Sequence, residues 1–350
     1  MRTTHGADQT TLGRSRTQEL SSGLSSRLVG QPDAVKAIVP FLAMYEAGLS
    51  PEGRPAGVFL LLGPTGTGKT KTVQALAETL HGSDRSMLRV DCGEYQMDHE
   101  VAKLIGAPPG YLGHRETQPV LTQQKLNAAA SERSSLALVL FDEVEKAAPS
   151  LTRLLLGVLD RGLLRLGDGN TVNFESAVIF FTSNLAAGEI SRELAPGFGF
   201  EGCVPKTGGS ARRIAAIGSH SARRAFPPEF MNRVDAVISY WPLGADSLAA
   251  ILDLLLTDLQ RQLERRLGKG HLRLEVPPES REFLLREGTS SLYGARELRR
   301  TVLRCLIQPL AELLTTQPVP AGSTVCAHLA AGGSGLELRP ASRRRGVLAA

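Results

Sequence analysis

Short apolar runs alternate with amphipathic segments along the first two thirds of the chain. The runs at residues 57–62, 87–91, 136–141 and 177–182 are short and rich in Leu, Val, Ile and Phe, a pattern typical of buried strands. Apolar residues at helical spacing separate them, for instance at residues 69–80. Strands that alternate with helices favour a parallel sheet with helices on both faces. The pattern therefore predicts an α/β fold.

Beyond Pro242 the pattern changes to that of an amphipathic helix. Five leucines fall on one helical stripe: Leu248, Leu252, Leu255, Leu259 and Leu263. A second helix is predicted from about residue 295 to residue 314, with a kink at Pro309 because proline lacks a backbone N–H. Short strands near residues 271–275 and 323–328 complete a small α+β domain.

These patterns predict four parts in the 350-residue chain. Residues 1–25 contain few apolar side chains, and their spacing fits neither a helix nor a strand, so we expect a disordered leader. A large α/β domain should cover residues 26–241, and the small α+β domain residues 242–340. A disordered tail is expected at residues 341–350. Within the large domain, the Gly-, Pro- and Ser-rich residues 192–220 predict an exposed insertion.

Composition and charge argue against a nucleic-acid-binding, membrane, secreted or metal-binding protein. The chain is 42% apolar and 21% charged, as is ordinary for a soluble globular protein. The net charge of +5 comes mostly from scattered arginines without interleaved aromatic residues, which favours a solvated surface over a nucleic-acid groove. No apolar stretch is long enough to span a bilayer, and the N-terminus lacks the apolar core of a signal peptide. The four cysteines are scattered without metal-ligand spacing. We expect a cytosolic protein without a membrane partner.

The first predicted strand runs directly into a glycine-rich segment with the spacing of a phosphate-binding P-loop. Its residues are Gly63, Pro64, Thr65, Gly66, Thr67, Gly68, Lys69 and Thr70. Glycines let the backbone wrap around phosphates so that amide N–H groups face them. Lys69 should reach the β- and γ-phosphates of ATP, and the Thr70 hydroxyl should bind Mg²⁺.

Two further predicted strands end in polar residues that suit ATP hydrolysis. The run at residues 138–141 ends in Asp142 and Glu143. Asp142 should hold Mg²⁺ with Thr70, and Glu143 should deprotonate the attacking water. Asn184 follows the strand at residues 177–182, where it could bind the γ-phosphate or the water; it could equally be a turn former, as Asn often is at strand ends.

With these motifs in place, the chain resembles a Clp-family AAA+ ATPase, and within that family the second ATPase module of ClpB, ClpA and ClpC. The resemblance runs from about residue 27 to about residue 338. It rests on separated segments: Leu28–Gln31, Asp91–Tyr95, Ile105–Gly113, Asp142–Ala147, Thr182–Leu185, Phe230–Asp235 and Tyr293–Arg300. The resemblance implies the AAA+ P-loop fold with a parallel sheet, followed by a small domain like that of the second Clp module.

The resemblance also implies roles for further residues. The adenine pocket would begin at Val29, Gly30 and Gln31. Arg233 would be the arginine finger that reaches the ATP of a neighbouring subunit, and Arg296 would touch the phosphates from its own subunit. Each arginine, taken alone, is more often part of a surface ion pair. Tyr111, which lies between glycines, would grip substrate in a central pore, although such a tyrosine can also stand in an ordinary turn. A second pore loop is expected near residues 163–170.

By resemblance, the function would be ATP-driven unfolding or remodelling of polypeptides by a homo-oligomeric ring, expected to be hexameric. A docking loop for a ClpP-like peptidase would lie at Phe198–Phe200, where burial or packing against a neighbouring subunit is the alternative. Two other functions stay open: a nucleotide-switched assembly scaffold, and a nucleic-acid-remodelling ATPase.

The chain departs from the family pattern in three places. Neither a substrate-receptor domain nor a first ATPase module fits in this sequence, so a single-ring protein is expected. Residues 114–119 replace an acidic, glycine-rich stretch after the pore tyrosine, and Pro227 replaces an arginine.

Overall fold

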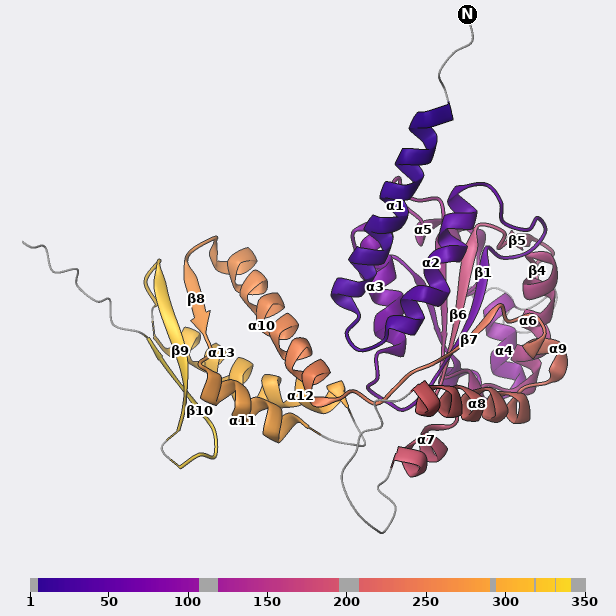
Figure 1. Ribbon diagram of the computed structural model, residues 1–350. Helices are drawn as coiled ribbons and strands as arrows, with labels where there is room; N and C mark the ends of the chain where they lie inside the picture. Colours follow the sequence, from indigo (N-terminus) through magenta and orange to yellow (C-terminus); the bar gives the residue numbers. More distant parts are fainter. Residues whose placement is uncertain are drawn as a thin grey trace, which may run out of the picture. The chain divides into compact units, whose positions relative to one another are not determined.

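The computed structural model describes residues 6–106, 119–194, 208–289, 294–317, 319–330 and 332–340. The chain divides into two compact units, Met1–Trp241 and Pro242–Ala350, each with its own core (Figure 1). The division lies where the sequence changes its pattern. Each unit is described by itself below.

A five-stranded parallel sheet forms the centre of the large unit. Its order is β2 (Leu88–Asp91), β3 (Ala137–Asp142), β6 (Ala177–Ser183), β1 (Gly57–Leu62) and β7 (Ala236–Ser239). Strands β1, β3 and β6 are buried along their whole length. Four of the five strands are those that the apolar runs predict, and the parallel α/β architecture is confirmed.

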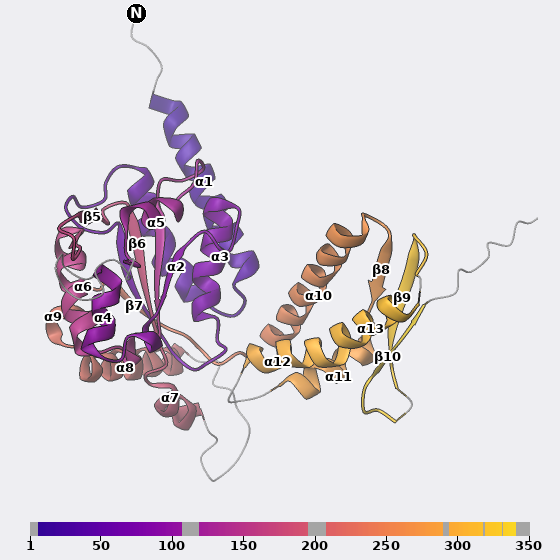
Figure 2. The same cartoon turned by 180° about the vertical axis from the view of Figure 1, so that it is seen from behind.

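Helices cover both faces of this sheet (Figures 1 and 2). Successive strand residues point to opposite faces, so the alternation creates two cores. Phe59 stacks on Phe180 in the core beneath the N-terminal helices, and Phe141 stacks on Phe181 in the other core. The first core packs against α1 (Gly6–Arg27), α2 (Pro32–Glu46) and α3 (Lys69–His81).

The second core lies on the opposite face and is covered by elements from the middle of the chain. These are α4 (Asp98–Ile105), α5 (Gln123–Ala128), α6 (Pro149–Arg161), α8 (Gly208–Ala225) and α9 (Pro228–Met231). A hairpin of β4 (Leu163–Arg165) and β5 (Thr171–Asn173) follows α6. The smaller elements are η1 (Cys92–Glu94), η2 (Val144–Lys146) and α7 (Ala187–Leu194).

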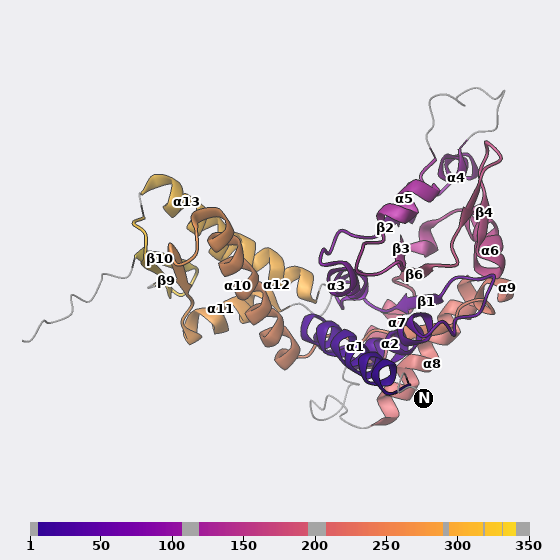
Figure 3. The same ribbon diagram turned by 90° about the horizontal axis from the view of Figure 1, so that it is seen from above.

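The N-terminal segment corrects the expectation of a disordered leader at residues 1–25. Residues 6–27 form α1, which lies beside α2 and α3 (Figure 3). Leu20 and Leu24 are buried in the first core. At Gly23 a Cβ atom would come within 2.8 Å of the Thr79 side chain, so this glycine permits close packing of the two helices. Burial of two leucines compensates for the polar composition that suggested disorder.

The expected exposed insertion at residues 192–220 is also wrong in part. Its second half belongs to α8, and Ile214 and Ala222 of this helix are fully buried. Because the segment is rich in Gly, Ser and Arg, its sequence does not reveal the apolar face of the helix. Residues 195–207 lie outside the described part of the chain.

The small unit packs helices on a three-stranded sheet with the order β10 (Leu336–Pro340), β9 (Ser323–Leu329) and β8 (Leu272–Glu275). Leu248, Leu252 and Leu259 of the predicted stripe are buried, and Leu255 and Leu263 pack against the same core. The helical elements are α10 (Ala245–Leu267), α11 (Pro278–Gly288), α12 (Ala295–Val302), η3 (Leu303–Ile307) and α13 (Gln308–Thr316).

The predicted irregularity near Pro309 takes the form of a π-helical turn. Segment η3 joins α12 to α13, and Pro309 lies in the first turn of α13, where a missing N–H costs no hydrogen bond. The wider π turn thus accommodates the proline without breaking the helical path.

Candidate functional site

The loop between β1 and α3 has the backbone of a phosphate cradle. Gly63, Gly66 and Gly68 all have positive φ angles, of 144°, 77° and 106°. A Cβ atom at Gly63 would lie 2.7 Å from the Tyr240 carbonyl oxygen, so no larger residue fits there. Gly68 caps α3 without a side-chain hydrogen bond, which leaves the first N–H groups of the helix to other acceptors. Such a helix start favours anionic phosphates.

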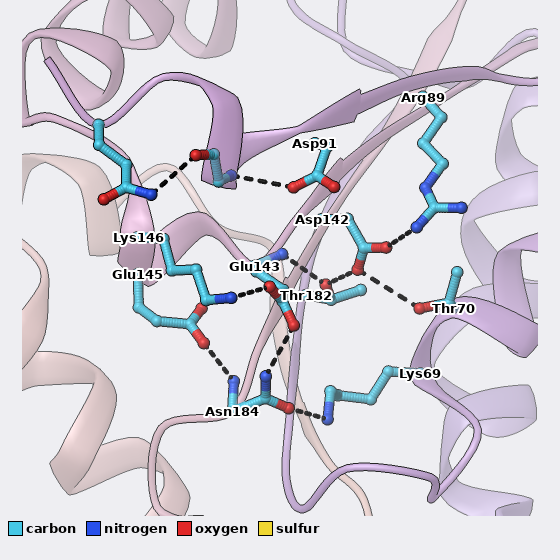
Figure 4. Close-up of polar contacts among 12 residues, drawn as sticks. Lys69, Thr70, Arg89, Asp91, Asp142, Glu143, Glu145, Lys146, Thr182 and Asn184 are labelled. Atoms are coloured by element: carbon cyan, nitrogen blue, oxygen red, sulfur yellow. Dashed lines mark hydrogen bonds and ion pairs between the residues drawn. The ribbon is translucent and has the colours of Figure 1, made fainter. Parts of the chain in front are cut away.

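The Lys69 side chain lies inside this loop. Its Nζ donates to the carbonyl oxygens of Gly63 at 2.6 Å and Pro64 at 2.8 Å. It also donates to Asn184 Oδ1 at 3.0 Å (Figure 4). The Thr67 hydroxyl donates to the Pro64 carbonyl oxygen and closes the turn. Lys69 therefore joins the P-loop to Asn184, the residue that follows β6.

Asp142 ends β3 beside the start of α3. Its Oδ1 accepts a hydrogen bond from the Thr182 hydroxyl and lies 3.4 Å from Thr70 Oγ1, while its Oδ2 pairs with Arg89 Nη2 at 2.6 Å. Only 7% of Asp142 is exposed, so Arg89 supplies the positive charge that a buried carboxylate requires. Figure 4 shows Arg89 and Thr70 approaching this carboxylate.

Glu143 adopts a backbone conformation that is uncommon for a residue other than glycine. Its φ angle is 57°, and its N–H donates to Thr182 Oγ1 at 3.0 Å. Its carboxylate forms an ion pair with Lys146 and accepts a hydrogen bond from Asn184 Nδ2 at 3.3 Å. Backbone conformations of this kind concentrate at functional sites, where surrounding contacts hold them.

A hydrogen bond also holds the backbone of Asn184 in place. Its N–H donates to Glu145 Oε1 at 2.9 Å, and its side chain bridges Lys69 and Glu143. This two-sided bridge places the Asn184 amide between the P-loop lysine and Glu143, while its predicted contact with the γ-phosphate or the water stays a prediction.

Burial or neighbouring charges raise the pKa of two groups near the site. The hydrogen bond and the negative charge of Glu143 raise the pKa of Lys146, so Lys146 stays protonated beside it. Burial raises the pKa of the Cys92 thiol, and the negative charge of Asp142 adds to the shift. Cys92 is therefore a protonated packing residue beneath the site and not a nucleophile.

The predicted entry to the adenine pocket also contacts the P-loop. Gly30 has a φ angle of 76° and is followed by Gln31, of which only 2% is exposed. Gln31 Nε2 donates to the carbonyl oxygens of Thr67 at 3.1 Å and Trp241 at 2.8 Å. The Trp241 N–H donates back to Gln31 Oε1 at 3.2 Å. Val29, half-buried, precedes this pair.

Arg233, the predicted arginine finger, contacts residues outside this cluster. Arg233 follows α9, where it pairs with Asp160 of α6. Arg296 begins α12 in the small unit, so its predicted contact with phosphate stays a prediction. Tyr111 and the proposed docking segment at Phe198–Phe200 lie outside the described residues.

Three residues of functional interest were not predicted as site residues: Arg89, Thr182 and Lys146. Arginine on a strand is usually a surface residue, so its pairing with Asp142 becomes visible only when β2 and β3 are aligned. Thr182 and Lys146 lie within recognised motifs, but the spacing gives no signal for their contacts.

The donor set fits a nucleotide and a divalent cation. A hydroxyl and a carboxylate oxygen stand 3.4 Å apart at Thr70 and Asp142, and oxygen ligands of this kind suit a hard cation that keeps several waters. No group of three or more His, Cys, Asp or Glu side chains is arranged for a metal within the described ranges. Phosphate oxygens and water would therefore complete the coordination shell. Likewise, no helix in the described segments has the length and apolar character to cross a membrane.

The sheet, the P-loop and the carboxylates at the end of β3 define a P-loop nucleoside triphosphatase. Residues 54–237 match the family described as AAA domain (Cdc48 subfamily). Residues 243–327 match the C-terminal, D2-small domain, of ClpB protein. The chain belongs to the AAA+ ATPases and resembles the second module of ClpB.

Individual relatives agree with this assignment. The chain is 38% identical to chaperone protein ClpB of Pseudomonas putida over 317 residues, which are 90% of this chain and 34% of the relative. It thus spans about a third of the length of such ClpB relatives. A protein of Pseudomonas aeruginosa named ATP-dependent protease ATP-binding subunit-like protein AmiB is 39% identical, over 88% of this chain and 82% of the relative.

A solved structure supports the fold. The cryoEM reconstruction of Hsp104 in a closed state, with ATPγS and FITC casein, has a TM-score of 0.75 and 27% identity. The match covers 93% of this chain and 52% of that one.

Proposed function

We propose that this chain uses ATP hydrolysis to unfold or remodel polypeptides, as a homo-oligomeric ring of six subunits in the cytosol. The observation that carries the proposal is the continuous polar chain from Lys69 through Asn184 to Glu143. It joins a phosphate-binding lysine to a carboxylate that can act as a base. Relatives named chaperone ClpB supply the link from ATP hydrolysis to work on proteins.

In the proposed reaction, the P-loop and Lys69 hold the β- and γ-phosphates. Glu143 accepts a proton from a water molecule whose oxygen attacks the γ-phosphorus, and the bond to ADP breaks. Asn184 orients that water, and Mg²⁺ at Thr70 and Asp142 would neutralise phosphate charge. Before this step, the Glu143 carboxylate must break its ion pair with Lys146. Half of the Lys146 side chain is exposed.

Two further residues couple hydrolysis to assembly in the proposal. Arg233 reaches the γ-phosphate of the adjacent subunit, a contribution worth about 10³–10⁵ in rate in related systems. Arg296 reports the nucleotide state to the small unit. Tyr111 contacts substrate in the pore. The comparisons with ClpB give no support to a ClpP-like peptidase at Phe198–Phe200, so the proposal is remodelling without a peptidase.

The test starts with Glu143→Gln in the purified chain. Binding of a fluorescent ATP analogue should stay within threefold of the parent, while hydrolysis falls by about 10²-fold or more because the base is lost. The matched control is Glu132→Gln, an exposed glutamate on another loop. A variant that hydrolyses ATP at the parental rate would exclude Glu143 as the base.

Polypeptide work is tested by stimulation of the ATPase. An unfolded protein such as casein should raise the rate of the parent and leave Tyr111→Ala unchanged. Stimulation by DNA in place of casein would identify a nucleic-acid-remodelling ATPase. A rate that responds to neither would favour the nucleotide-switched scaffold.

A further inference from the structure

The guanidinium of Arg233 has a defined position inside its own subunit. Its Nη2 donates to Asp160 Oδ2 at 2.9 Å, and its Nη1 donates to the Glu229 carbonyl oxygen. Arg233 is about a quarter exposed and Asp160 about half exposed. The pair therefore lies at the surface of the large unit, where the guanidinium can be approached from outside.

The backbone that carries Arg233 is firmly anchored. Arg233 follows the short helix α9, and its N–H donates to the Phe230 carbonyl oxygen at 3.1 Å. The Phe230 ring is fully buried and packs edge-on against Phe181 of β6, with 5.0 Å between ring centroids. It also packs against Phe226 at 5.3 Å. The base of the arginine side chain is thus fixed to the core of the sheet.

The backbone that carries Asp160 is fixed by the end of α6. Gly162 caps this helix with a φ angle of 62°, and its N–H donates to the Val158 carbonyl oxygen at 2.9 Å. A Cβ atom at Gly162 would lie 3.0 Å from the Glu175 side chain, so the helix end packs closely. The Phe174 N–H donates to the Gly162 carbonyl oxygen at 2.6 Å.

With both backbones fixed, the direction of the guanidinium depends on its side-chain contacts. An arginine has several rotatable bonds, and ordering them costs conformational entropy. The two side chains also carry opposite charges. The hydrogen bond from Arg233 lowers the pKa of Asp160, and the positive charges of Arg161 and Arg54 add to the shift. Asp160 is therefore ionised when it holds Arg233.

We propose that Asp160 is a positioning residue that orients Arg233 toward the ATP of the adjacent subunit. The inference rests on the proposed function, in which Arg233 acts in trans. A half-exposed ion pair is weak, so it restricts the guanidinium without competing strongly against a triphosphate. Loss of the carboxylate leaves Arg233 in place but increases its range of conformations, and a small misplacement of a positioning group can cost up to about 10²-fold in rate.

The experiment compares Asp160→Asn with Asp160→Glu in the full chain. Asp160→Asn should lower kcat for ATP hydrolysis about tenfold and leave KM within twofold, because ATP binding does not involve this residue. Asp160→Glu should recover most of kcat, since it restores the charge. Asp84→Asn, at an exposed aspartate, should match the parent. Sedimentation velocity and thermal melting should show unchanged assembly and folding.

A double-mutant cycle separates the inference from the proposed function. In the Arg233→Ala background, Asp160→Asn should have no further effect, because its only route to the reaction is through Arg233. An additional loss in that background overturns the inference, as does a kcat for Asp160→Asn equal to or above that of the parent. The second result would mean that Asp160 withholds Arg233 instead of orienting it. If Arg233→Ala itself retains full activity, the trans arginine of the proposed function fails first.

Discussion

At the scale of single residues, the Thr182 hydroxyl connects the two acidic residues of the site. It donates to Asp142 Oδ1 and accepts the N–H of Glu143. One hydroxyl thus fixes the Asp142 carboxylate, the proposed metal ligand, and holds the left-handed backbone of Glu143, the proposed base. Thr182 is 1% exposed, so water cannot replace either hydrogen bond.

Replacement of Thr182 by valine should therefore affect stability and activity together. The side chain keeps its shape but leaves a buried N–H and a carboxylate oxygen without their partner, which costs about 1–3 kcal/mol. ATP hydrolysis should fall at least about tenfold because Glu143 loses its fixed orientation. Urea unfolding and steady-state ATPase assays measure the two effects.

Thr182→Ser is the matched control, because it keeps the hydroxyl. It should retain most of the activity. Equal losses in the serine and valine variants would show that the methyl group, and not the hydroxyl, is the important part of Thr182.

At the scale of secondary-structure elements, α1 is the clearest addition to what the sequence predicts. Its buried residues Leu20 and Leu24 lie four positions apart, and the rest of the segment is mostly polar or glycine. Three leucines in a long polar segment give too weak a period to predict a helix, because the stabilisation comes from packing against α2 and α3.

Leu24→Ala should destabilise the large unit by about 2–5 kcal/mol, because Leu24 is fully buried in the first core. Thermal unfolding monitored by circular dichroism measures the loss. Ser25→Ala, at the neighbouring exposed position, should have little effect. Similar melting curves for both variants would contradict the packing of α1.

The central strands could be predicted from sequence because each is buried on both faces and reads as an unbroken apolar run. Strand β7 at residues 236–239 escaped prediction because only one of its residues, Ile238, is buried. Helix α8 escaped because its few buried apolar residues, Ile214 and Ala222, lie among Gly, Ser, His and Arg. In both cases tertiary packing decides the structure where local pattern is weak.

The candidate site, like the fold, has parts that the sequence predicts and parts that it does not. The P-loop, Asp142, Glu143 and Asn184 are recognisable because each belongs to a compact local motif. The contacts of Arg89 with Asp142 and of Arg233 with Asp160 join residues 53 and 73 positions apart. No local spacing encodes such contacts, since they depend on strand register and on the path of α6.

At the scale of the whole molecule, the chain builds two units with separate cores. The small unit has its own sheet and a core centred on residues such as Leu252, Leu284 and Leu306. A unit of about one hundred residues is large enough to bury a stable core.

A fragment of residues 242–350 should therefore fold alone. We expect a helical circular dichroism spectrum and one cooperative unfolding transition in urea. Leu284→Ala in this fragment should lower the midpoint, because Leu284 is fully buried. A gradual change without a transition would mean that the core needs the large unit.

The Gln31 amide joins two distant backbone segments of the large unit. It is bonded to Trp241, the last residue before the chain enters the small unit, and to Thr67 inside the P-loop. A side chain bonded to both backbones couples their positions, because displacement of one requires the other to move or a hydrogen bond to break. Gln31 thus ties the last residue of the large unit to the turn of the P-loop, although it lies outside that loop in the sequence.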